Sequence, residues 1–194
     1  MKAIDHFKQN RPVHLARRDV FFERAAELIS AQHNAFPPET KIGDYEEILF
    51  LLRVARQHAR FSIRDTGSNE TDEQFGRFIN LLAGNVKAVL SMMNLKHTVE
   101  SDTSFFTFLG ANQASVALQA EEYQRRANDI VRSIHNTLKL AEGPYEQLKV
   151  DNAAASSEEE LLRYEKAHKH FHEQVKEGKH RYKIAPSSRK IAHF

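Results

Sequence analysis

The chain has 194 residues with 28 Lys or Arg, 26 Asp or Glu, a net charge of +2 and no cysteine. This length suits one ordinary domain, and the missing cysteines exclude disulfides, thiolate zinc sites and cysteine nucleophiles. The N-terminal stretch MKAIDHFKQNRPVH has no apolar signal-peptide core, and we expect no later stretch to reach the roughly 18 apolar residues of a membrane span. We therefore expect a cytoplasmic protein without membrane attachment.

The positive charge is concentrated at the C-terminus. From Lys176 to Phe194 there are six Lys or Arg residues and one acid, whereas residues 1–175 carry 22 basic and 25 acidic side chains. This division predicts a helical domain over 1–178 and a basic tail over 179–194. Cations interleaved with Tyr, His and Phe are suited to hold phosphates and stack on bases, although a solvated chain end is the simpler alternative.

The first three helices are predicted from apolar spacing and local start signals. A first helix should begin at Pro12 and end at Phe36, before Pro37-Pro38. A second should run from Asp44, capped with Glu47, to Arg64. A third should begin at Thr71, with Gln74 in the same capping role, and its apolar row is Phe75, Phe78, Ile79, Leu82, Val86, Val89, Leu90 and Met93.

Two further helices complete the expected fold. One of about 40 residues should run from Asp102 to Glu142, with a bend or break near Gly110, and stop at Gly143-Pro144. The last should open at Ser157, form a capping box with Glu160 and close at Gly178. The chain is therefore predicted to be all-α, an antiparallel bundle of five or six helices with one long central helix and a basic C-terminal tail.

Four arginines of the second helix form the clearest functional pattern. Arg53, Arg56, Arg60 and Arg64 are offset by three, four and four residues, so they lie in one row along the helix. Each directly follows a residue of the expected core-facing row, which is Leu52, Ala55, Ala59 and Ile63. Two interpretations remain open: the row is neutralised internally, by Glu121 and Glu122 or by Glu158–Glu160, or it binds an anionic partner.

Histidines of the last helix suggest a metal site as an alternative. Glu165, His168 and His172 share one helical face, because they are offset by three and four residues. The E-x-x-H spacing resembles part of the ligand set of ferritin-like di-iron proteins, which implies a divalent metal bound by these three side chains. The second copy of the motif, Glu177 to His180, lies in the same segment and not on a partner helix. A half-buried packing role for His168 is the competing interpretation.

The spacing R-x-x-x-x-H occurs at Arg53 to His58 and at Arg163 to His168. It resembles the short catalytic signature of HEPN-type helical ribonucleases, which implies metal-independent RNA cleavage. In that case His58 would act as acid and base, while Arg53 or Arg56 would stabilise charge on the phosphorus centre.

Taken together, the patterns favour a non-enzymatic helical binding or adaptor protein without a cofactor. Its partner is expected to be nucleic acid or an acidic protein surface, and a homodimer is compatible with the long helix. The partner-binding residues are expected to be Arg53, Arg56, Arg60, Arg64, Lys179, Arg181, Lys183, Arg189 and Lys190.

Overall fold

The described part of the chain is all-helical. A computed structural model describes residues 2–34, 42–63, 70–102, 110 and 112–179. Its helices are α1 (Lys2–Asn34), α2 (Ile42–Ile63), α3 (Glu70–Ser101), α5 (Gln113–Ala154) and α6 (Glu158–Lys176). The expected all-α class is therefore confirmed.

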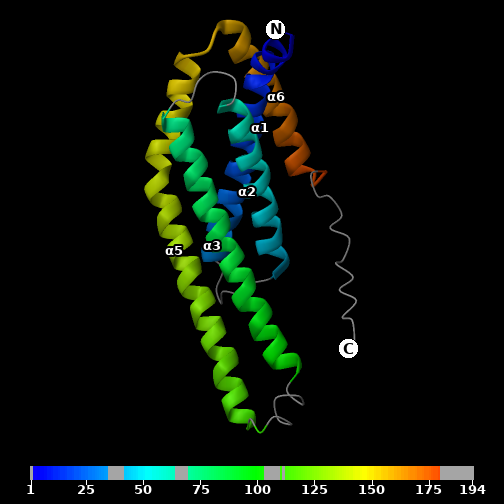
Figure 1. The fold of residues 1–194 in the computed structure, drawn as a ribbon, viewed down its shortest axis with the longest axis vertical. Coiled ribbons are helices and arrows are strands. Elements are labelled where there is room, and N and C mark those ends of the chain that lie inside the picture. The colour runs from blue at the N-terminus through cyan, green and yellow to red at the C-terminus, as the bar shows by residue number, and fades with distance from the viewer. Residues whose placement is uncertain (1, 35–41, 64–69, 103–109, 111, 180–194) are drawn as a thin grey trace.

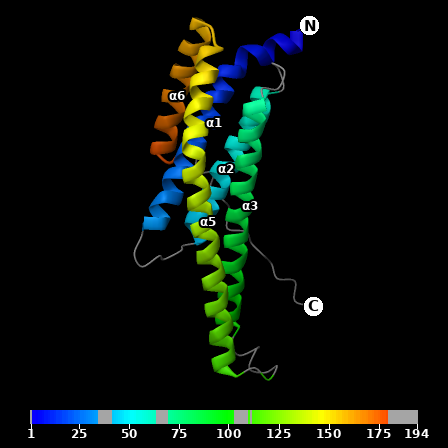
Figure 2. The ribbon, with the colours of Figure 1, turned by 90° about the vertical axis from the view of Figure 1, so that its left-hand side faces the viewer.

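Consecutive helices run in opposite directions, as Figures 1 and 2 show. α1 packs against α2 and α6, while α3 packs against α2 and α5. α1 and α6 run in the same direction, since Asp19 contacts Tyr164 and, one turn later on both helices, Glu23 contacts His168. The C-terminal half of α3 and the N-terminal half of α5 extend beyond the other helices (Figure 2).

The predicted start of the first helix is wrong. α1 begins at Lys2 and passes through Pro12, which lacks the N–H for one helical hydrogen bond. Pro12 is buried and lines the same cavity as Leu161 of α6, so tertiary packing offsets the lost bond. The predicted end at Phe36 lies outside the described residues.

The predicted caps of the second and third helices are also wrong. Asp44 lies inside the first turn of α2 and accepts a hydrogen bond of 2.6 Å from Gln32 of α1. Gln74 does not cap α3, because its amide donates to the Glu70 carboxylate. The expected apolar rows hold where they are described: all the listed α3 residues are buried or packed on the core, and Leu52, Ala55 and Ala59 are buried on α2. The side chain of Ile63, the last residue of the α2 row, lies outside the described part of the structure.

The long helix begins and ends later in the sequence than predicted: α5 spans Gln113–Ala154, not Asp102 to Glu142. The expected break near Gly110 is a change of helix, with α3 continuing to Ser101 and Asn112 capping α5 through a bond of 2.7 Å from the Ser115 amide. Gly110 has φ of +86°, which favours glycine. Pro144 does not end α5, and the helix continues to Ala154 because Tyr145 and Leu148, just beyond the proline, are buried in the core.

The predicted boundaries of the last helix are confirmed. Ser157 and Glu160 form a reciprocal capping box at the start of α6. At its end Gly178 has φ of +68°, and the Gly178 and Lys179 amides donate to the carbonyls of Val175 and Gln174. This is the Schellman arrangement, and it satisfies two carbonyl groups of the last turn.

α3 carries one stretch that is long and apolar enough to cross a membrane by length and composition. The expectation that no stretch reaches that length was therefore too strong. The finding is weak evidence for a membrane span, since core helices of many proteins pass the same test. Residues of this stretch from Ile79 to Met93 supply a row of buried side chains to the core.

A second, smaller apolar cluster lies apart from the main core. It joins the end of α3 to the start of α5 through Val99, Val116 and Ala120, with Tyr123 packed against them. This cluster holds together the part of the α3–α5 pair that extends beyond the other helices (Figure 2).

The core also contains a buried ion cluster that sequence analysis missed. Arg18 is 1% exposed and lies between Asp19 and Asp72, at 2.7 and 2.9 Å. Tyr164 of α6 donates to Asp19, and Asn152 of α5 donates to Asp72. Four helices therefore meet at one guanidinium group.

Replacing Arg18 should destabilise the fold strongly. We expect Arg18→Met to lower the free energy of unfolding by about 3–5 kcal/mol, because it leaves Asp19 buried without its cation and leaves Asp72 only the longer contact of 3.9 Å with Arg11. Urea denaturation followed by circular dichroism measures this change. Arg77→Met is the matched control: Arg77 is 80% exposed in its ion pair with Glu73, and its loss should change stability by less than about 1 kcal/mol. Equal effects of the two substitutions would contradict the role given to Arg18.

Candidate anion-binding surface

The arginine row of α2 flanks the buried face of the helix, as its spacing predicts. Arg53 and Arg60 are exposed. Arg56 is half-buried, and its Nε is buried without a hydrogen-bond partner among the described residues. Arg64 lies outside the described residues. Three guanidinium groups therefore border one edge of the α2 core face.

These arginines differ from most of the other described arginines in lacking ion pairs. Within the described part of the chain, Arg53, Arg56 and Arg60 have no carboxylate within ion-pair distance, and Arg17 contacts the aromatic rings of Phe21 and Phe171. All the other described arginines pair with a carboxylate: Arg11, Arg18, Arg24, Arg77, Arg125, Arg126, Arg132 and Arg163. The α2 row is thus a concentration of uncompensated positive charge.

The carboxylates that were expected to neutralise this row have other partners or positions. Glu122 pairs with Arg125 and Arg126 on its own helix. Glu159 pairs with Arg163, and Glu160 is held in the capping box. Glu121 and Glu158 are exposed, and neither forms an ion pair within the described residues. Neither predicted cluster, Glu121 with Glu122 or Glu158–Glu160, is therefore seen to neutralise the arginine row.

A pair of histidines lies between α1 and α2, beside the arginine row. The Nδ1 atoms of His14 and His58 are 2.9 Å apart, and the two rings are stacked with centroids at 5.1 Å. Burial, the Arg17 cation and the neighbouring His14 lower the pKa of His58 to about 4. At neutral pH His58 is therefore uncharged, and one of the two rings donates its proton to the other.

The resemblance to HEPN-type ribonucleases gains no geometric support from this arrangement. Arg53 and His58 are five residues apart on α2, which places them about 140° apart around the helix. Arg53 is exposed, whereas His58 is half-buried against His14 and Phe61. The imidazole that would transfer the proton is directed into the α1–α2 interface.

The histidine pair predicts a specific acid sensitivity. Since the pKa of His58 is lower in the folded state than in the unfolded chain, the unfolded chain binds a proton first as the pH falls. Stability should therefore decrease between about pH 6.5 and pH 4. His58→Phe should reduce this slope in urea denaturation, while His97→Phe, at an exposed position on α3, should leave it unchanged. An unaltered slope in His58→Phe would contradict this assignment.

The histidines of α6 form a different set of contacts from the predicted metal site. His168 Nε2 lies 3.6 Å from Glu23 Oε2 on α1, and this contact raises the pKa of His168. Glu165 is exposed, and His172 stacks on His168 with ring centroids 6.4 Å apart. The described residues contain no group of three or more His, Asp or Glu side chains placed to hold a metal ion.

Glu23 is a further polar centre that the sequence did not indicate. Tyr145 and Lys149 of α5 both donate to its carboxylate, at 3.1 and 3.4 Å. With His168 they connect α1, α5 and α6. The only sequence signal was an acid on the apolar side of the first helix, one residue after Phe22.

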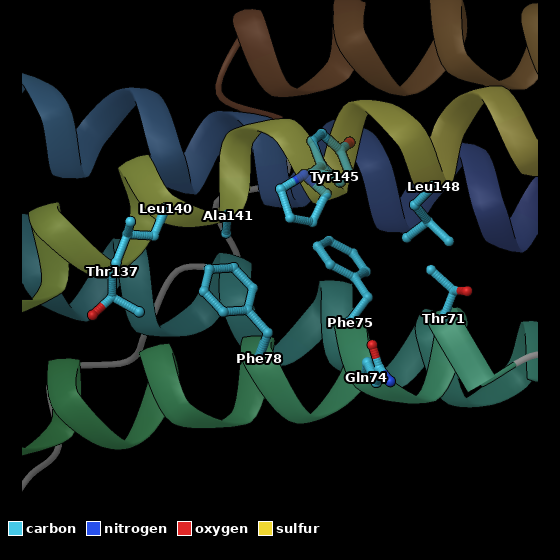
Figure 3. Close-up of a pocket in the computed structure, with 10 residues that line it drawn as sticks. Thr71, Gln74, Phe75, Phe78, Thr137, Leu140, Ala141, Tyr145 and Leu148 are labelled. Carbon is cyan, nitrogen blue, oxygen red and sulfur yellow. The ribbon is translucent and has the colours of Figure 1, made fainter.

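An apolar pocket of about 290 Å³ lies between α3 and α5 (Figure 3). Phe75 and Phe78 enter it from α3, and Leu140 and Pro144 border it on α5. Leu140 is 82% exposed, and its carbonyl lacks the usual helical donor because residue 144 is proline. The polar side chains at this pocket are uncharged, so it is separate in chemistry from the arginine surface.

Of the predicted partner-binding residues in the tail, the structure describes Lys179 alone. Lys179 is exposed and pairs with Glu177. Arg181, Lys183, Arg189 and Lys190 lie outside the described residues.

Comparison with known proteins identifies no relative. The chain matches no family model, no curated protein and no solved structure. A functional assignment therefore depends on the chemistry of the surface itself.

Proposed function

We propose that this chain is a non-enzymatic helical binding protein whose α2 arginines bind an anionic partner. Nucleic acid is the favoured partner and an acidic protein surface is the alternative. In this proposal the helices form an antiparallel bundle with α5 as its long central member, and the basic tail is a separate element.

The observation that carries this proposal is the contrast among the arginines. Ion pairs occupy the guanidinium groups on α3, α5 and α6, whereas Arg53, Arg56 and Arg60 have no carboxylate partner within the described residues. Like charges on one helical face repel one another unless an external anion compensates them. Binding a row of negative charges therefore lowers the free energy of such a surface.

The dimensions of the row suit a repeating anion. Arg53 and Arg60 are seven residues apart, or about 10.5 Å along the helix axis, with Arg56 between them. Guanidinium groups bind phosphate oxygens in a bidentate manner, and a polynucleotide presents phosphates at regular intervals. The exposed positions of Arg53 and Arg60 make this contact possible without rearrangement of the core.

Reversing the two exposed charges should remove the binding. We expect Arg53→Glu with Arg60→Glu to weaken binding of a fluorescent single-stranded RNA by at least about tenfold at low salt. The salt dependence should also fall by about one unit of slope for each lost phosphate contact. Fluorescence anisotropy between about 50 and 200 mM salt measures both quantities.

The matched control is Arg125→Glu with Arg126→Glu, which makes the same charge change at arginines paired with Glu122. This control should weaken RNA binding clearly less, since both arginines are exposed but their charges are already balanced by Glu122. Equal loss in the two double variants would show a general charge effect and would overturn the proposal. Binding to a poly-glutamate peptide in preference to RNA would identify an acidic protein as the partner.

A further inference from the structure

The surface between α1 and α5 contains a groove next to the end of α6. It has a volume of about 480 Å³, with Phe22 and Ala26 of α1 and Leu138, Ala141 and Tyr145 of α5 among its apolar lining. α6 covers α1 only as far as its last turn, where Val175 and Lys176 share a second pocket with Glu23 and Glu27. Glu23 and Glu27 also line the groove, so the end of α6 adjoins it directly.

The groove combines this apolar floor with negative charge. Its lining includes Glu23, Glu27, Glu142 and Glu146 and no Lys or Arg. Glu27 and Glu146 are exposed and pair with Arg24 and Lys149, which lie outside the lining. Glu142 is exposed and forms no ion pair within the described residues. A ligand for this groove therefore needs apolar groups for the floor and cations for the acidic side chains.

The chain itself continues from this point with a segment of that composition. Beyond Lys179 lie 15 residues with four Lys or Arg, no Asp or Glu, and the large apolar residues Tyr182, Ile184, Ile191 and Phe194. In extended conformation successive side chains point to opposite sides, so Arg181 and Lys183 share one side while Tyr182 and Ile184 share the other. This alternation matches an apolar floor beside acidic side chains.

The distances are also compatible. The groove follows α1 from Glu23 to Ser30, which is about 10.5 Å of helix. Four extended residues span about 13 Å, so the stretch from Arg181 to Ile184 is long enough to follow it. α1 and α6 run in the same direction, and the last turn of α6 adjoins the groove at Glu23 and Glu27.

We propose that the basic C-terminal segment of this chain, starting with residues 181–184, binds in the groove between α1 and α5 of the same molecule. The contact places the cations of Arg181 and Lys183 beside the groove glutamates and the Tyr182 and Ile184 side chains on its floor. The groove glutamates then compete with any outside anion for the positive charges of the tail. This inference does not depend on the function proposed for the α2 arginines.

Cysteine cross-linking in the full chain tests this contact, and the absence of native cysteines makes it specific. One variant carries Ser30→Cys in the groove and Ala185→Cys in the tail, and a bismaleimide reagent links the two thiols. The control pairs Ala185→Cys with Ser91→Cys, an exposed position on α3. Docking should give a local thiol concentration that makes the Ser30 pair react at least about tenfold faster, in a band of monomer size.

Charge reversal then tests the role of the glutamates. Glu27→Lys with Glu142→Lys should reduce the cross-linking rate of the Ser30 pair to the control level; both residues are exposed, so circular dichroism should show an unchanged fold. Equal rates in the groove and control pairs would overturn the proposal. Cross-links found only between two chains would also overturn it, because the tail would then occupy a second copy. Arg53→Glu with Arg60→Glu should leave the cross-linking unchanged, which separates this contact from the proposed anion binding.

Discussion

The burial of Arg18 is the constraint on which the arrangement of the helices depends. A guanidinium group that is 1% exposed needs nearby negative charge, and Asp19 and Asp72 supply it from α1 and α3. Asn152 and Tyr164 complete the hydrogen bonds of these aspartates from α5 and α6. Sliding one helix by a turn would separate buried charges, so the cluster favours a single register.

Helical periodicity predicted the buried faces because these depend on spacing alone. The α3 row from Phe75 to Met93 is the clearest example, and the capping box of Ser157 was equally local. Prolines misled the prediction for the opposite reason. Pro12 and Pro144 each remove one backbone hydrogen bond, but packing contacts contributed by distant parts of the chain keep both helices continuous.

The candidate site could be predicted only in part. The spacing of Arg53, Arg56 and Arg60 placed them along the edge of the core face, and this holds in the structure. Their lack of ion pairs was not predictable, since it depends on which helices are neighbours. The same applies to Glu23 and its partners Tyr145 and Lys149, which lie more than 120 residues away in sequence. An apolar row interrupted by Arg18 and Asp19, between Leu15 and Phe22, was the one available sign of a buried ion cluster.

The extension of α3 and α5 beyond the other helices separates the molecule into regions of unequal cooperativity. Its distal part is held by the small cluster of Val99, Val116, Ala120 and Tyr123, whereas the main core joins all the described helices. Backbone amides near that end should therefore exchange with solvent through local opening, at a lower free-energy cost than global unfolding. Such an opening leaves α2 folded, because α2 lies against α1 and the other half of α3.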